Sequence, residues 1–422
     1  MKRHPMHGRA GFSLIELLVA MVIGLVVTLA VTSVLIRSEG SKRSSTSVND
    51  LNQTGAHAAF VLDRAIRSAG SGYSQRWADV YGCLLDVRHS GAVPPQLLPI
   101  PAALPATSAF RGLTNAPALQ IRLAPLIIAK DLADTTGAGA EVRGDILLVM
   151  GGTAGVGEAA QAVLPLASPL AADNLRLDNT LGYRDNDLVL LANRAVPAGC
   201  MLQQVASRPA GDYGQSLPLA GNYFHTGGGV VALADFPADT LALQLGRDVA
   251  NPPQFQAYAV GANRTLFAYD LLLPATGAAR DVPVADSVVE MRAVYGLDTT
   301  GPTGKPDGIL DSWTDATGLF AASALTDGSV VARERLRQIV AVRIGLILRT
   351  ALQERAAPTS ASGVTDQETY QQASGTVLAL FGDLPAAVQR TRALGSTELG
   401  YRFRTVEITI PLRNVLMAPL PP

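Results

Sequence analysis

Gly11-Phe12-Ser13-Leu14-Ile15-Glu16 opens an apolar run that continues to Ile36. Residues 14–36 have only five non-apolar interruptions, which are Glu16, Gly24, Thr28, Thr32 and Ser33. Roughly 20 helical residues at about 1.5 Å each cross the hydrocarbon core of a bilayer, so residues 14–36 predict a membrane-spanning helix. An ionised carboxylate near the start of a span is costly to bury, and the presence of Glu16 therefore indicates a function.

The residues before the span are basic, with Lys2, Arg3 and Arg9 in the first eleven positions. The positive-inside rule places these eleven residues in the cytoplasm and the chain after the span on the other side of the membrane. A secretory signal peptide would be followed by a small-residue cleavage site, and residues 37–45 contain no clean one. The leader therefore needs another explanation.

The stretch from Gly11 to Ala20 closely resembles the class III signal of type IV pilins and type II secretion pseudopilins. The resemblance implies a leader of residues 1–11, which a membrane prepilin peptidase removes after Gly11. It also implies that the new N-terminal amine of Phe12 is methylated and that Glu16, the fifth mature residue, acts in subunit assembly. The alternative is an ordinary signal anchor that tolerates one Glu.

The composition argues against disorder and against nucleic-acid binding. Only 16% of the 422 residues are charged and 48% are hydrophobic, while 40 Gly and 26 Pro predict many turns. These values favour a loop-rich β protein. The formal net charge of −1 provides no basic field for nucleic acid.

Two cysteines, Cys83 and Cys200, both follow the predicted span. The predicted topology places them in an oxidising bacterial periplasm, where a single disulfide follows naturally. The alternatives are two free buried thiols or a metal site, and the lack of nearby histidines disfavours the metal site.

After the span, apolar residues recur at helical spacing, at Leu51, Ala58, Leu62, Ala65, Ile66 and Ala69. Residues 12–36 therefore predict a transmembrane or fibre-core helix and residues 37–69 its amphipathic periplasmic continuation. Gly70-Ser71-Gly72 ends this helix. We expect residues 70–422 to form one β-rich periplasmic globular domain.

Short apolar runs between turn residues predict strands at 145–150, 187–192, 201–206, 255–260, 265–273, 287–295, 340–349 and 401–412. Alternation within 287–295 predicts a half-buried strand with Glu290 and Arg292 facing outward. Residues 91–117 and 351–376 are predicted to be surface loops. The predicted fold class is α+β and pilin-like, with a long N-terminal helix packed on a predominantly antiparallel β-sheet domain that carries loop insertions.

The order of landmarks along the chain resembles the PilW family of minor pilins. The landmarks are Arg64 to Gly70 with Tyr81-Gly82-Cys83, Asn186 to Leu191 with Gly199 to Gln203, Val284 to Met291, Val340 to Ile344, and Pro411 to Asn414. The resemblance supports a bridge between Cys83 and Cys200. Residues 91–140 and 207–254 show no such match.

This resemblance implies a minor pilin that helps to initiate or cap type IV pili, with a minor pseudopilin of a type II secretion system as the alternative. It implies a single-pass inner-membrane protein with a periplasmic globular domain that can enter the pilus. The implied partners are other minor pilins, the major pilin, the prepilin peptidase and the inner-membrane assembly platform, with a pilus-tip adhesin as a further candidate.

The residues beyond the helix carry little recognisable chemistry. Asp298, Asp307 and Asp311 lie in a turn-rich segment where relatives often carry a calcium-like loop, although Lys305 opposes a cation there, and a plain solvated loop is the alternative. His225 precedes three glycines, and His57 and His89 have no acidic or thiol partner at a recognisable spacing, so a catalytic triad centred on histidine has no support. Arg333, Arg335 and Arg337 are interpreted as a solvated face. We therefore predict neither an enzyme nor a cofactor, with calcium as the candidate exception.

Overall fold

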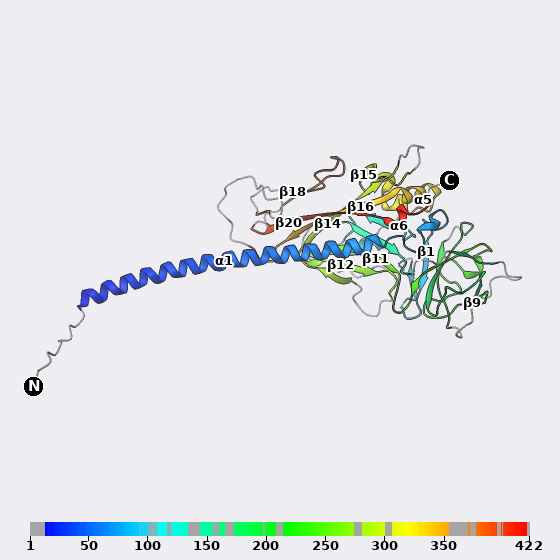
Figure 1. Ribbon diagram of the computed structural model, residues 1–422, viewed down its shortest axis with the longest axis horizontal. Coiled ribbons are helices and arrows are strands. Elements are labelled where there is room, and N and C mark those ends of the chain that lie inside the picture. The colour runs from blue at the N-terminus through cyan, green and yellow to red at the C-terminus, as the bar shows by residue number, and fades with distance from the viewer. Residues whose placement is uncertain are drawn as a thin grey trace, which may run out of the picture. The chain divides into compact units, whose positions relative to one another are not determined.

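The structure is a computed structural model that describes residues 13–92, 94–98, 100, 104, 108–115, 120–133, 144–154, 160–164, 173–196, 199–207, 214–273, 281–299, 306–353, 370–371, 377–394, 398 and 400–419. The chain divides into two compact units, residues 1–50 and residues 51–422. Helix α1, Leu14–Arg67, contributes to both units (Figure 1).

The first unit consists, among its described residues, of Ser13 and the part of α1 that ends at Asp50. Its segment Leu14–Ile36 has a mean hydropathy of 2.8 and is long and apolar enough to cross a membrane. The hydroxyls of Thr28, Thr32 and Ser33 donate to carbonyl oxygens one turn earlier in the same helix. Hydroxyls that are satisfied within the helix add little cost in a bilayer, where water is absent.

In the second unit, α1 is one-sided. Leu51, Ala58, Leu62 and Ile66 are buried, whereas the opposite face, with Phe60 at 62% exposure, is open. At Gly55 the helix lies so close to the sheet that an added Cβ would stand 3.2 Å from Cγ2 of Val406. The helix ends at Arg67, and Gly70 adopts a φ of +78° while its N–H donates to the carbonyl of Met150.

Twenty strands form three large sheets and two two-stranded sheets among the described residues (Figure 1). The first sheet has the order β15 (Ser312–Thr314), β14 (Val288–Leu297), β16 (Ile339–Arg349), β20 (Arg402–Pro411), β17 (Tyr370–Gln371). The second has the order β13 (Asp281–Ala285), β12 (Thr265–Asp270), β11 (Gln254–Gly261), β4 (Ile146–Gly151), β3 (Leu126–Ala129). The third has the order β2 (Gln96–Leu98), β1 (Leu85–Arg88), β8 (Cys200–Gln204), β7 (Asp187–Ala192), β10 (Leu241–Arg247), β5 (Gln161–Ala162).

The two-stranded sheets are the hairpin of β18 (Val377–Leu380) with β19 (Arg390–Ala393), and the pair of β6 (Asn174–Arg176) with β9 (Ser216–Pro218). Short helices complete the unit: η1 (Ser74–Arg76), α2 (Trp77–Val80), α3 (Arg111–Asn115), η2 (Leu233–Asp235), η3 (Ala262–Arg264), η4 (Gly318–Phe320), α4 (Ala322–Leu325), α5 (Val330–Gln338) and α6 (Arg413–Leu416). Pairing between the described strands is antiparallel except between β1 and β8.

The predicted fold class is confirmed, because a long N-terminal helix accompanies a mostly antiparallel sheet domain. Each predicted strand overlaps a strand of the structure, in order β4, β7, β8, β11, β12, β14, β16 and β20. The two predicted loops were wrong in part, since residues 91–117 contain β2 and α3 and residues 351–376 contain β17. These elements span only two to five residues each, too few to show a period.

The prediction that Glu290 and Arg292 face solvent was wrong. Glu290 is 5% exposed, and Nε of Arg292 donates to its Oε1 at 2.6 Å. The β18–β19 hairpin covers this face of the sheet and packs Leu378, Leu380 and Phe381 against it in a separate apolar cluster. Both faces of β14 and β16 are therefore covered, which explains their long apolar runs.

The C-terminal segment fastens the end of α1 to the short helices that follow it. Nδ2 of Asn414 donates to the carbonyl of Ala69 at 3.0 Å, and Nε1 of Trp77 donates to that of Pro419 at 2.9 Å. Arg337 is 1% exposed and donates to the carbonyl of Ala418 at 3.2 Å. The interpretation of Arg337 as part of a solvated face was therefore wrong, because Arg337 is buried where it donates to the C-terminal segment.

Candidate functional site

Glu16 lies in the first turn of α1 and forms a capping box with Ser13. The backbone N–H of Ser13 donates to Oε2 of Glu16 at 3.1 Å, and the backbone N–H of Glu16 donates to Oγ of Ser13 at 3.2 Å. The spacing Ser-x-x-Glu before an apolar run is the sequence signature of this motif. The carboxylate also lies at the positive end of the helix dipole. Glu16 therefore starts its own helix, and both capping residues follow the predicted cleavage point.

The capping box leaves chemistry available at Glu16. The N–H of Ser13 is bonded to Oε2, and a carboxylate has two oxygens with about four acceptor positions. One carboxylate can therefore cap its helix and accept from a cation of another subunit. Gly11 and Phe12, the predicted processing residues, lie outside the described residues.

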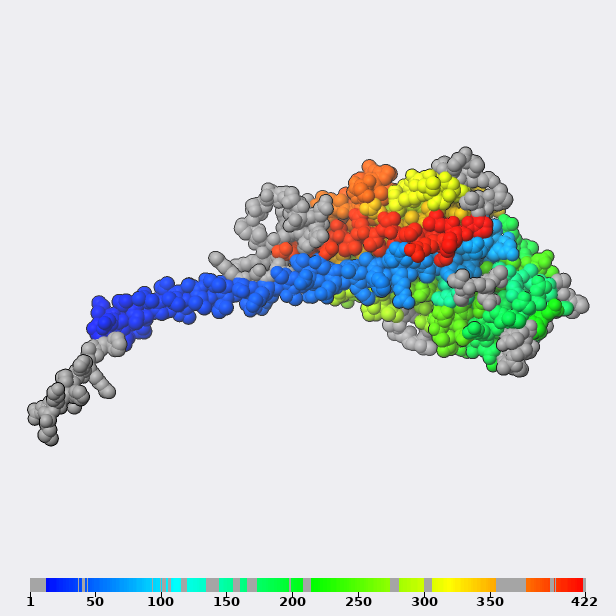
Figure 2. Space-filling model, viewed as in Figure 1, coloured from blue at the N-terminus to red at the C-terminus, as the bar shows by residue number. Residues whose placement is uncertain are grey.

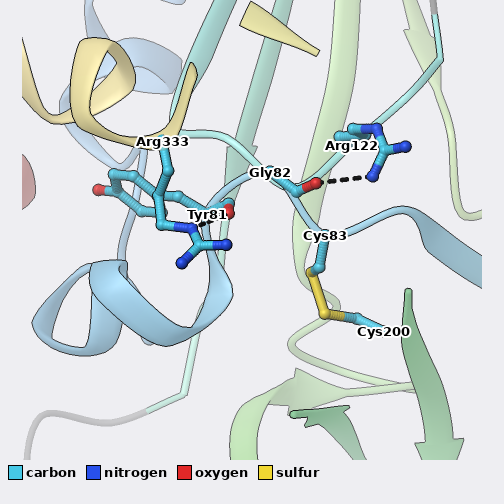
Figure 3. Close-up of a disulfide and its surroundings, with 6 residues drawn as sticks. All are labelled: Tyr81, Gly82, Cys83, Arg122, Cys200 and Arg333. Carbon is cyan, nitrogen blue, oxygen red and sulfur yellow. Dashed lines mark hydrogen bonds between the residues drawn. A yellow bond between two sulfur atoms is a disulfide. The ribbon is translucent and has the colours of Figure 1, made fainter. Parts of the chain in front are cut away.

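Cys83 and Cys200 are joined in a disulfide with a Cα–Cα distance of 5.6 Å (Figure 3). Cys200 begins β8, and Cys83 stands two residues before β1. The residue pairs Leu85–Cys200 and Asp86–Met201 give β1 and β8 a short parallel register. The bridge holds together two strands that share few backbone contacts.

Two arginines fasten the chain just before Cys83 (Figure 3). Nη1 of Arg122 donates to the carbonyl of Gly82 at 2.9 Å, and Nε of Arg333 donates to that of Tyr81 at 3.1 Å. Burial lowers the pKa of both arginines, although each keeps its charge at neutral pH. Gly82 has a φ of +77°, which a side chain would strain. The tight turn therefore has its own support beside the disulfide.

The carboxylates of Asp298 and Asp311, the calcium candidates, accept hydrogen bonds from backbone N–H groups. The two carboxylate oxygens of Asp298, which is fully buried, accept from the N–H groups of Asp307 at 3.0 Å and Gly308 at 2.6 Å. Oδ2 of Asp311 accepts from the N–H of Thr299 at 2.7 Å. N–H groups aimed at these oxygens repel a cation, and the described part of the chain has no group of three or more acidic, His or Cys side chains fit to hold a metal.

We expect millimolar calcium to leave the thermal unfolding midpoint unchanged. Weak extracellular calcium sites have Kd values of about 10⁻⁴ to 10⁻³ M, so a few millimolar would reveal one. Asp298→Ala should lower stability by about 2–3 kcal/mol, because the two hydrogen bonds that the buried Asp298 carboxylate accepts from Asp307 and Gly308 are lost. Differential scanning fluorimetry with CaCl₂ or EDTA measures both, and a midpoint that rises with calcium and falls with EDTA would restore the calcium interpretation.

His225 has an acidic partner that the sequence did not reveal. Nε2 of His225 lies 3.6 Å from Oδ1 of Asp86, and the two side chains are 8% and 0% exposed. Oδ2 of Asp86 accepts from the N–H groups of Val230 at 2.6 Å and Val231 at 3.0 Å. The partners stand on β1 and on a glycine-rich turn far along the chain, so no spacing in the sequence could have indicated the pair.

This Asp–His pair serves the fold. At Gly229 an added Cβ would stand 2.2 Å from Oδ2 of Asp86, so only glycine lets the turn approach the carboxylate. His57, by contrast, lines an open groove beside α1 and β13, and His89 packs its ring edge-to-face on Tyr223 at 4.8 Å. His57 therefore lies in a different set of contacts from His89 and His225, which both contact Tyr223.

Asp86→Asn should destabilise the protein by about 2 kcal/mol at pH 7, because charged hydrogen bonds become neutral ones. Burial opposes the charge, but His225 and the N–H groups of Val231 and Val230 together hold the pKa of Asp86 below its ordinary value. A depressed carboxylate pKa gives stability that is present above about pH 4 and is lost as pH falls through the folded-state pKa.

The difference between the two proteins should therefore shrink below pH 4. Urea unfolding at pH 7 and pH 3.5 measures it. The exposed Asp178→Asn is the matched control and should change stability little at either pH. A constant difference across this range would contradict a stabilising Asp86 charge.

Two models of known protein families match parts of this chain. The family model for the type IV pilus-assembly protein W matches residues 257–414, and the model for the prokaryotic N-terminal methylation motif matches residues 6–32. The first match covers β12, β14, β16 and β20, and the second covers Glu16 and most of the apolar segment. Searches of curated proteins and of solved structures give no match.

The methylation motif, the apolar helix and the antiparallel sheet domain define a membrane-anchored type IV pilin with a single candidate span among the described residues. Within that class, residues 257–414, which include β12 to β20, match the PilW family model, and this match together with the methylation motif supports a PilW-family type IV pilin. This family consists of structural proteins of the pilus. The Asp86–His225 pair agrees with a structural role, because the Asp86 carboxylate accepts hydrogen bonds from backbone N–H groups.

Proposed function

We propose that this pilin is a minor pilin that helps to initiate or cap the type IV pilus as part of a minor-pilin complex. The observation that carries the proposal is the presence, in one chain, of the methylation motif at residues 6–32 and the PilW match at residues 257–414. A single helix, Leu14–Arg67, joins the membrane segment to the sheet domain. The chain thus combines a fibre-core helix with a large domain suited to specific contacts.

The same proposal assigns partners and a location. The partners are other minor pilins, the major pilin, the prepilin peptidase and the inner-membrane assembly platform, with a pilus-tip adhesin as a further candidate. The N-terminus is cytoplasmic and the sheet domain periplasmic, which the basic leader and the Cys83–Cys200 bridge support. The protein acts without a resident cofactor.

Deletion of the gene tests the function. Cells that lack this chain should carry few or no surface pili, and a plasmid copy should restore them. Electron microscopy and twitching motility are the readouts, and secretion of the substrates of a type II system is the comparison. Normal pili with lost secretion would contradict the proposal and indicate a pseudopilus component.

Gly11→Val should block removal of the leader, because a peptidase site shaped around glycine cannot take a branched side chain. Mass spectrometry of the N-terminal membrane peptide should find methylated Phe12 in the unmodified protein and the intact precursor in the variant. Gly8→Val, in the same leader, is the matched control and should be processed. Intact Met1 in peptidase-positive cells with the unmodified chain would refute the processing site.

A further inference from the structure

The outer edge of β20 differs from the other sheet edges in the described part of the chain. The edge strand β13 contains Pro283, which cannot donate, and its pairing with β12 shifts register. Strands β2, β5 and β15 are two or three residues long, and β3 is wholly buried. Proteins protect sheet edges by such means, because a long regular edge is a template for another strand.

Strand β20 has none of these protections from Arg404 to Ile410. Its pairing with β16 runs from Phe403 to Pro411 without a register shift, while β17 pairs only with Arg402 and Phe403. The carbonyl of Arg402 accepts from Thr350, and the N–H of Leu412 donates to Val340, both on the β16 side.

Backbone groups alternate sides along a strand, so those of Thr405, Glu407 and Thr409 point away from β16. Among the described residues these groups have no backbone partner. Figure 2 shows the C-terminal residues, in red, at the surface beside the second part of α1. Among the described residues, a row of alternating donors and acceptors is therefore left free along this edge.

The side chains of this edge specify what can bind. On the α1 side, Val406 and Ile408 are half-buried and leave apolar β-branched surface open. On the other side, Glu407 is held by Nη2 of Arg343 at 2.7 Å, between Thr405 and Thr409. A complementary strand carries apolar side chains on one face and neutral or basic ones on the other.

A second copy of this chain does not fit that description. The antiparallel register that uses all three outward residues of both copies is centred on Glu407 and sets Glu407 opposite its equivalent. Like charges directly opposite each other destabilise a strand pair. The charge at the centre of the edge therefore favours a different chain.

We propose that the open edge of β20, from Arg404 to Ile410, binds an extended strand of another pilin subunit. The bound strand lies beside β20, in line with β17. Backbone hydrogen bonds to Thr405, Glu407 and Thr409 supply affinity, and Val406 and Ile408 supply selectivity for apolar side chains. This inference rests on the proposed function, since it names how the protein contacts another subunit of its complex.

Thr409→Pro in the full chain tests the edge, because it removes an outward N–H and leaves the ladder to β16 intact. Thr409→Val keeps that N–H and is the matched control. With the other pilins of the same system co-expressed, we expect the Pro variant to retain about tenfold less of its pilin partner on co-purification, with the control unchanged. The thermal midpoints of both variants should match the unmodified protein.

Hydrogen exchange on the unmodified full chain gives a second test that needs no substitution. The amides of Thr405, Glu407 and Thr409 should exchange fast in the protein alone and slowly in the co-purified complex. If the Thr409→Pro variant does not fold, this measurement is the deciding test. Slow exchange in the monomer, or protection that appears with a dimer of this chain, would overturn the proposal. Normal co-purification of a folded Thr409→Pro protein would overturn it as well.

The outcomes separate this inference from the proposed function. If deletion of the gene abolishes pili while Thr409→Pro supports them, only the β20 edge is refuted. If deletion leaves pili normal, the minor-pilin function itself fails.

Discussion

Cells whose only copy is Glu16→Ala should insert the protein normally and yet carry few or no pili. The substitution makes Leu14–Ile36 more apolar, so membrane insertion improves. The resemblance to type IV pilins implies that this carboxylate pairs with the N-terminal amine of a neighbouring subunit. Leaving one partner of a buried pair uncompensated costs about 3–5 kcal/mol, at least about a hundredfold in association.

The capping box makes the controls specific. Glu16→Gln keeps a side chain that can accept from the N–H of Ser13 but removes the charge, whereas Ser13→Ala keeps the charge and removes the other half of the box. If charge pairing drives assembly, the Gln variant should fail like the Ala variant and Ser13→Ala should assemble. If capping is the role, the Gln variant should assemble.

Pilus counts and co-purification with other pilins measure these variants, and the melting temperature of the sheet domain should be the same in all of them. Normal piliation with Glu16→Ala would count against any assembly role for this carboxylate.

Loss of the disulfide should be the largest single loss of stability. The chain-entropy model gives about 4–5 kcal/mol for a bridge across 117 residues. The double variant Cys83→Ser with Cys200→Ala removes the bridge without burying a hydroxyl at the fully buried Cys200. We expect a fall in the unfolding midpoint of about 10 °C or more and a lower abundance in cells.

Reduced wild-type protein is the control for the double variant and should unfold at a similar temperature. Alkylation of denatured, non-reduced protein should label no cysteine in the wild type, because both are bridged. Two labelled thiols would refute the bridge, and an unchanged midpoint in the double variant would show that Arg122 and Arg333 suffice to hold the turn.

Local periodicity explains which elements the sequence revealed. The apolar run of Leu14–Ile36 and the spacing of Leu51, Ala58 and Leu62 are properties of neighbouring residues, so the helix could be predicted without the fold. Strands β7, β14, β16 and β20 carry five or more apolar or β-branched residues each and were recognised in the same way. Strands of two to four residues, such as β5 and β6, show no period and were missed.

The candidate sites likewise divide into those formed by neighbouring residues and those formed by residues far apart in the sequence. The motif from Gly11 to Glu16 is contiguous, and the Ser13–Glu16 capping box could have been read from its spacing. The Asp86–His225 pair could not, because 139 residues separate its members and a turn at Gly229 brings them together.

By itself, the amino-acid sequence determined that this protein has a membrane helix, a processing motif with Glu16 behind it, and strands that need a sheet, because each depends on side chains a few positions apart. Only the tertiary structure decided that Glu290 and Arg337 are buried, that Asp86 meets His225, and that β20 keeps an open edge. These features depend on which distant segments cover which face, and burial of a shared core, not the local pattern, sets that arrangement.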